Sequence, residues 1–153
     1  MKKQIEIIKK VRANLLEGIK DLNAEQLNKI PEGFNNNIIW NLGHLIAVQQ
    51  GVCYKRAGLP TMISDDFWEK YRSGSKPEGI INETEIDHIK QLFFTSLDQL
   101  EADYDKGIFS NYTAWATRSN VEIASIDDAL SFVPFHEGLH SGVIGTMSRL
   151  LAS

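Results

Sequence analysis

Four stretches of this chain place apolar residues three and four positions apart, and no other feature of the sequence limits its fold as strongly. This spacing lines one face of an α-helix, whereas a half-buried strand alternates apolar and polar residues. The first stretch covers residues 3–22, and the second runs from about Asn37 to Arg56. The third begins near residue 82, and the fourth runs from residue 125 to about Leu150. The pattern predicts an all-α protein. Residues 104–124, which precede the last stretch, are irregular and compatible with a short hairpin.

A long connection separates the second stretch from the third. Residues 57–82 are rich in glycine, proline and serine, and connections beyond about 12–15 residues are usually functional or serve as crossovers. Within it, Phe67, Trp68 and Tyr71 are expected to form a short helical turn that packs its rings on the rest of the protein. Four helices with one long crossover between the second and third predict a four-helix bundle. The length of 153 residues suits a single domain over residues 1–153.

The composition is that of an ordinary globular protein, and it excludes several classes. Hydrophobic residues make up 42% of the chain, charged residues 24%, and the net charge is −4. An acidic excess argues against nucleic-acid binding, which usually needs a basic surface. Charged residues interrupt the apolar runs, so neither a membrane span nor a secretory signal is expected. A single cysteine fits a reducing compartment, and we expect a cytoplasmic protein.

His136 and His140 stand four residues apart in the last predicted helix. Residues at this spacing lie about 5–6 Å from each other on one helix face, which suits two imidazoles that share a metal ion. By spacing alone, two unrelated histidines on a partly buried face explain the pattern equally well. The neighbouring positions are apolar, which indicates that the two imidazoles face the core: Val133, Leu139, Val143 and Met147. Buried imidazoles need polar partners, and one metal ion would serve both.

A third histidine, His44, lies on the inner stripe of the second predicted helix, in line with Trp40 and Val48. An imidazole from a facing helix would complete a three-histidine site for a divalent metal. Three protein ligands leave a coordination position open, as in catalytic rather than structural zinc sites. Imidazole nitrogens suit both Zn²⁺ and Ni²⁺.

The residues from His136 to His140 also match the HExxH pattern of zinc peptidases, in which the glutamate is the general base. The chain after His140 contains no His, Asp or Glu, so the downstream third ligand of those enzymes is missing. Glu137 is turned about 100° from His136 around the helix and is expected to face solvent. The pattern therefore does not predict a peptidase.

Other candidate residues have simpler interpretations. His88 lies beside the apolar stripe of the third helix and is expected at the surface. Cys53 is expected to be a small core residue rather than a ligand or nucleophile. Gly142 and Gly145 are expected to let the last helix approach a neighbour closely.

Three segments resemble the DinB-like (YfiT-type) family of four-helix proteins. Residues 37–45 (NIIWNLGHL) are similar to the signature of the family's second helix. Residues 135–142 (FHEGLHSG) are similar to the His-x-x-x-His motif of its last helix, and residues 60–77 to its long connection. The three segments occur in the family's order, and the resemblance covers nearly the whole chain.

The resemblance implies a divalent metal, often nickel or zinc, held by one histidine of the second helix and two of the last. Those ligands correspond to His44, His136 and His140. Some members are transferases that use a low-molecular-weight thiol such as bacillithiol or mycothiol, with the metal binding the thiolate. We therefore expect a metal-dependent thiol S-transferase that acts on a small electrophile. Lys55 and Arg118 are candidates for holding the thiol cofactor only because they are cationic, and solvated surface residues are the simpler interpretation.

Two alternatives stay open, a non-enzymatic metal-binding stress-response protein and a metal-dependent hydrolase. The family also implies a homodimer. A surplus of apolar residues on the first and last helices agrees with that expectation: Ile7, Ile144 and Leu151. The long connections could instead cover these residues.

Overall fold

A computed structural model describes residues 1–152 and is mostly helical. The helices are α1 (Lys2–Gly18), α2 (Ala24–Asn28), α3 (Ile38–Cys53), α4 (Asp65–Tyr71), α5 (Glu83–Asp105) and α6 (Ile126–Leu151), with a 3₁₀ turn, η1, at Lys55–Ala57. An antiparallel hairpin of β1 (Trp115–Ala116) and β2 (Glu122–Ile123) precedes α6. The predicted all-α class is confirmed, and the irregular region contains the short hairpin. Among the described helices, none has both the length and the apolar composition needed to cross a bilayer.

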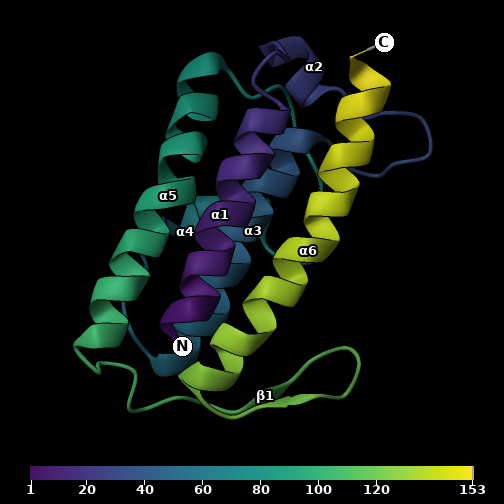
Figure 1. Ribbon diagram of the computed structural model, residues 1–153. Helices are drawn as coiled ribbons and strands as arrows, with labels where there is room; N and C mark the ends of the chain where they lie inside the picture. Colours follow the sequence, from purple (N-terminus) through teal and green to yellow (C-terminus); the bar gives the residue numbers. More distant parts are fainter. Residues whose placement is uncertain (153) are drawn as a thin grey trace.

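The long helices α1, α3, α5 and α6 lie side by side (Figure 1). α1 packs against α5 and α6, and α3 packs against the same two helices. In Figure 1, α1 and α6 run away from the end of the molecule that carries the hairpin, whereas α3 and α5 run toward it. Residues on facing sides of α3 and α6 are therefore neighbours although they are far apart in the sequence.

The long helices after α1 begin at side-chain caps. Asn37, Asn82 and Ser125 each accept a hydrogen bond from the backbone N–H three residues further on. Such a bond satisfies a donor of the first turn that has no partner inside the helix. The predicted helix starts near residues 37, 82 and 125 are confirmed.

Two predicted helix ends are wrong by several residues. The first helix was expected to reach residue 22 but ends at Gly18, and the short α2 follows after a capping box formed by Asn23 and Gln26. Five residues are too few to show a helical period, so the sequence pattern did not reveal α2. The second helix was expected to reach Arg56 but ends at Cys53, because the chain tightens into η1.

α3 is the central helix, and Val48 is its one residue that is not buried. The short α4 covers part of α3, as expected from its aromatic residues, and glycines make the close approach possible. A Cβ on Gly51 would lie 2.6 Å from the Trp68 ring, and a Cβ on Gly43 would overlap the Tyr71 ring. A helix buried on all sides is apolar on all sides, so the few polar residues of α3 stand out.

The expected role of Gly142 and Gly145 is wrong. A Cβ on Gly142 would meet nothing within 4 Å, and one on Gly145 would reach only Arg149 of the same helix. Neither glycine is therefore needed for close contact between α6 and its neighbours.

Candidate metal centre

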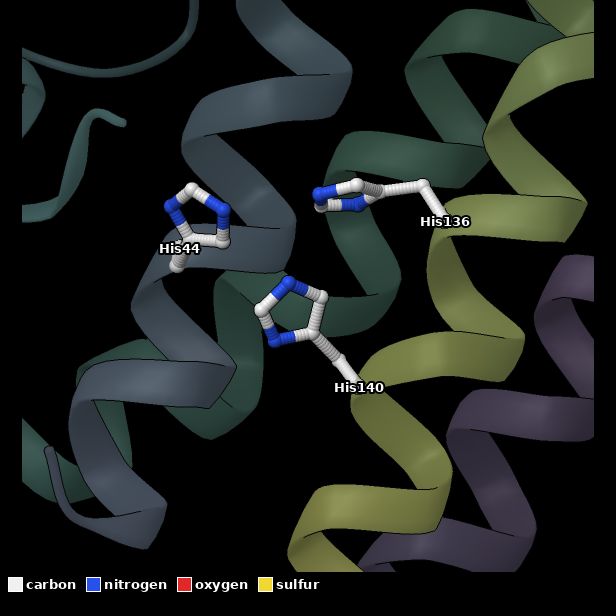
Figure 2. Close-up of side chains that lie close together, drawn as sticks. All are labelled: His44, His136 and His140. Carbon is white, nitrogen blue, oxygen red and sulfur yellow. The ribbon is translucent and has the colours of Figure 1, made fainter. Parts of the chain in front are cut away.

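α3 and α6 bring His44, His136 and His140 together. The ring centroid of His44 lies 5.2 Å from that of His136 and 4.8 Å from that of His140, and the two α6 rings are 4.6 Å apart. One possible ligand nitrogen from each residue lies within 4.8 Å of the other two. Figure 2 shows the three rings pointing toward one another where α3 faces α6. The structure thus assembles all three histidines identified from the sequence.

His44 is oriented by two neighbours. Its Nδ1 lies 2.8 Å from the backbone oxygen of Tyr71, a pure acceptor, so the proton is on Nδ1. Trp40, one turn earlier on α3, stacks on the His44 ring with 4.7 Å between the ring centroids and an angle of 11° between the planes. These contacts leave Nε2 of His44 unprotonated and available to a ligand.

His140 is oriented by Asn41 in the same manner. Its Nδ1 lies 2.7 Å from Oδ1 of Asn41. The Nδ2 group of Asn41 donates to the side chain of Asn36 and to the backbone oxygen of Asn37, so Oδ1 is the atom that faces His140. Nδ1 of His140 therefore donates to Asn41, and its Nε2 keeps the lone pair. A hydrogen bond to the distal ring nitrogen is a common feature of histidines that bind metals.

Burial is the main reason why all three imidazoles have low pKa values. It lowers the pKa of His136 to about 3 and the pKa of His140 to about 4, and nearby histidines add to both shifts. Burial also lowers the pKa of His44, although the bond to Tyr71 opposes this shift. All three rings are neutral at pH 7, which is the protonation state that binds a metal ion.

The expectation that Glu137 faces solvent is wrong. Glu137 is completely buried, and its Oε1 accepts hydrogen bonds from Nε and Nη2 of Arg12 on α1, at 3.1 and 2.7 Å. The expectation treated the side of α6 that carries Glu137 as protein surface, but α1 packs against that side. Because its carboxylate is bound to Arg12, Glu137 is not placed as the general base of an HExxH site.

The four remaining candidates lie in different places. His88 is exposed on α5, as expected. Cys53 is buried, as expected, and burial raises the pKa of its thiol to about 12. Lys55 lies over the ring of Trp68. Arg118 is exposed in the loop between β1 and β2, and its charge contributes to the low pKa of His44.

Sequence reasoning missed the residues that orient the histidines and bind Glu137. Asn41 lies among apolar residues of α3, and Arg12 lies on the buried face of α1 between Ile8 and Leu15. A polar residue on an apolar stripe is the signal that could have identified both. No comparable signal exists for Tyr71, because it contributes a backbone oxygen.

The arrangement is chemically suited to a divalent cation. Each zinc–nitrogen bond is about 2.0–2.1 Å long, so nitrogens that share one ion lie about 3–4 Å apart. Small rotations of the three rings would reduce the present separations, which are below 4.8 Å, to that range. Three close and neutral imidazoles, of which His44 is buried and the other two are partly buried, could thus bind one metal ion.

The sequence of the chain matches one protein family. A family model described as the DinB superfamily matches residues 7–144, which include all three histidines. The comparison with curated proteins found no match.

Proposed function

Because this chain belongs to the DinB superfamily, we propose that His44, His136 and His140 bind one divalent metal ion. The observation that supports this proposal best is the convergence of the three rings. The hydrogen bonds of His44 and His140 support it further, since each leaves Nε2 free. Nitrogen donors favour Zn²⁺ or Ni²⁺ over Mg²⁺ or Ca²⁺.

We further propose that the protein is a transferase that joins a low-molecular-weight thiol to a small electrophile. A bound divalent metal lowers the pKa of a coordinating thiol, so that the thiolate is present at neutral pH. Three histidine ligands leave room for such a thiol. The protein's own thiol is not suited to this role, because Cys53 is buried and its pKa is raised to about 12. The thiol would therefore come from a small molecule.

Aromatic rings lie beside two of the histidines. Trp40 stacks on His44, and the ring of Phe132 lies 5.9 Å from that of His136. His136 and His140 are themselves only partly buried. Glu137 is bound to Arg12, which makes a hydrolase with Glu137 as base the weaker proposal.

Two structural expectations belong to the same proposal. We propose that the fold is a four-helix bundle in which the connection between α3 and α5 is the crossover; the packing of each of α1 and α3 against both α5 and α6 supports this. We also propose a homodimer. Exposed apolar residues on α1 and α6 support it, namely Ile7, Phe135 and Leu139, whereas Ile144 and Leu151 are buried within the chain.

Light scattering tests the dimer directly. The mass of one chain is 17.3 kDa. A dimer gives twice that mass at micromolar concentration, and a mass of one chain would exclude it. The metal proposal would survive that result, because all three ligands come from one chain.

The function is tested by following the consumption of monochlorobimane or 1-chloro-2,4-dinitrobenzene with a panel of thiols. Cysteine, glutathione, bacillithiol and mycothiol are each tried with protein loaded with Zn²⁺ or Ni²⁺. We expect metal-dependent turnover with at least one thiol, its loss in His136→Ala, and its retention in His88→Ala, where an exposed histidine is removed. A metal-loaded protein that is inert with every thiol and electrophile would favour a non-enzymatic metal-binding or stress-response role. Ester or amide hydrolysis without any thiol would favour the hydrolase.

A further inference from the structure

The three histidines of the candidate metal centre differ in how their rings are fixed. Nδ1 of His44 is bonded to the backbone oxygen of Tyr71, and Nδ1 of His140 is bonded to Oδ1 of Asn41. A half-turn of either ring about its Cβ–Cγ bond would place a carbon where Nδ1 now lies and would break that hydrogen bond. His44 and His140 therefore each have one preferred ring orientation.

His136 has no bond of this kind. Its ring lies beside three others, with centroids 5.2 Å from His44, 4.6 Å from His140 and 5.9 Å from Phe132. Among the residues that the structure describes, neither ring nitrogen of His136 has a hydrogen-bond partner or an ion pair. A half-turn of this ring therefore breaks no hydrogen bond to the protein.

Both nitrogens of His136 are accessible. In the described part of the chain, the buried side-chain atoms that lack a hydrogen-bond partner are Nε2 of Gln49 and Oε2 of Glu137. The nitrogens of His136 also lack a partner but are not among these buried atoms, so each of them reaches the surface of the chain. The same holds for Nε2 of His44 and Nε2 of His140. Water can thus bond to His136 in either ring orientation.

The backbone that leads to His136 is also less constrained. Pro134 lies inside α6, two residues before His136. Proline has no backbone N–H, so the helix lacks the hydrogen bond that this position would otherwise donate to the preceding turn. The proline ring also crowds the carbonyl group four residues earlier. The turn before His136 therefore has one hydrogen bond fewer than an uninterrupted helix.

We propose that His44 and His140 are the preorganised ligands that hold the metal ion, and that His136 is a mobile third ligand that turns onto the ion when it binds. This inference rests on the proposed function and specifies it, because it gives the three ligands different roles. A hydrogen bond to the distal nitrogen fixes a ligand ring and raises the basicity of the nitrogen that binds the metal. His136 has neither advantage, so its bond to the metal is the weakest of the three.

The metal affinities of single variants test these roles. His44→Ala, His136→Ala and His140→Ala are each titrated with Zn²⁺ in competition with a chromophoric chelator. A distal hydrogen bond typically changes metal affinity about 10–100-fold, so His44→Ala and His140→Ala should each lose at least about tenfold more affinity than His136→Ala. A loss in His136→Ala that equals or exceeds the loss in either other variant overturns the inference.

His88→Ala is the matched control, because it removes an exposed histidine of α5. It should bind Zn²⁺ as tightly as the unaltered protein. A weaker affinity in His88→Ala, of the size seen in His140→Ala, would mean that the losses do not report the metal ligands, and it would overturn the inference as well.

A second measurement does not depend on the stability of the variants. Proton–nitrogen NMR spectra of the histidine rings are recorded at pH 7 on the unaltered, metal-free protein. His44 and His140 should each keep the proton on Nδ1, whereas His136 should sample both neutral tautomers and settle into one form when Zn²⁺ is added. A single tautomer of His136 before the metal is added overturns its mobility.

Failure of the inference can be distinguished from failure of the proposed function. If the unaltered protein binds no Zn²⁺, the proposed metal centre is contradicted and the roles of its ligands fall with it. If the unaltered protein binds Zn²⁺ and the three variants lose affinity equally, the metal centre stands and the special role of His136 does not.

Discussion

Arg12 of α1 and Glu137 of α6 form an ion pair with 2.7 Å between Nη2 and Oε1, and both side chains are buried. Arg12 also donates to the backbone oxygens of Phe93 on α5 and Leu45 on α3. This arginine therefore contacts all three other long helices. Glu137 directly follows His136, so the pair connects the position of a histidine to the packing of α1.

The first prediction concerns this pair. Arg12→Met leaves the carboxylate of Glu137 buried without a partner, which should lower the free energy of unfolding by about 3–5 kcal/mol. Urea unfolding followed by circular dichroism measures the change. A loss below about 1 kcal/mol would show that the pair is solvated.

The control for this prediction removes both charges. Replacing a buried ion pair by apolar residues of similar volume is often close to neutral, so Arg12→Met with Glu137→Met should recover most of the stability lost by Arg12→Met. The double variant should still bind metal through its histidines. Loss of metal from a stable double variant would mean that Glu137 has a role at the site beyond its pairing with Arg12.

The second prediction concerns the support of His140. Asn41→Ala removes the oxygen that accepts the Nδ1 proton, and loss of such a partner typically weakens metal binding about 10–100-fold. Competition with a chromophoric chelator measures the affinity. Asn28→Ala is the control, because Asn28 bonds to the backbone oxygens of Ala24 and Ile81. It should cost stability without changing metal affinity, and an equal effect of both variants on affinity would refute the role of Asn41.

The third prediction uses the glycines. Gly43→Ala would push its methyl group into the Tyr71 ring, and Tyr71 supplies the oxygen bonded to His44. We expect a loss of about 1–3 kcal/mol from overpacking together with weaker metal binding. Gly142→Ala, with open space around it, should stabilise α6 by about 0.5–1 kcal/mol. Thermal unfolding of both variants checks the contrast, and a neutral Gly43→Ala would contradict the packing of α4 on α3.

The fourth prediction concerns pH. In metal-free protein the folded pKa of His136 is lowered to about 3 and that of His140 to about 4, whereas an unfolded histidine titrates near 6.5. Between those values the unfolded chain binds more protons, so stability is complete above about pH 6.5 and declines as the pH falls toward 4. Urea unfolding at pH 7, 6 and 5 should show this decline. It should be smaller in the double variant His136→Asn, His140→Asn.

The exposed His88 provides the control for the pH prediction. His88→Asn should keep the decline of the unaltered protein, because this substitution leaves both site histidines in place. An unchanged pH dependence in the double variant would mean that the two site histidines are more solvated than the structure shows.

The features that could be predicted from the sequence are those set by local interactions. Asn82 and Ser125 cap helices through bonds to residues three positions away, so the helix starts were correct. His136 and His140 are one turn apart on the same helix, which fixes their proximity. His44 could be added because it lies on the inner stripe of a helix, although its contact with α6 depends on tertiary packing.

The features that were missed depend on which helix lies beside which. Glu137 was assigned to solvent because the pattern of one helix does not show that α1 covers its other side. Its partner, Arg12, is distant in sequence. The support of His44 by Tyr71 needs α4 to approach Gly43 and Gly51, and no periodic pattern encodes that contact.

Elemental analysis tests whether the three histidines bind one metal ion. The protein is purified without chelator and without a nickel resin, beside a variant with His44, His136 and His140 all changed to Ala. We expect close to one equivalent of a divalent metal in the unaltered protein and almost none in the triple variant. Less than about a tenth of an equivalent in the unaltered protein, which would mean weak binding, or equal metal content in the two proteins, would contradict it.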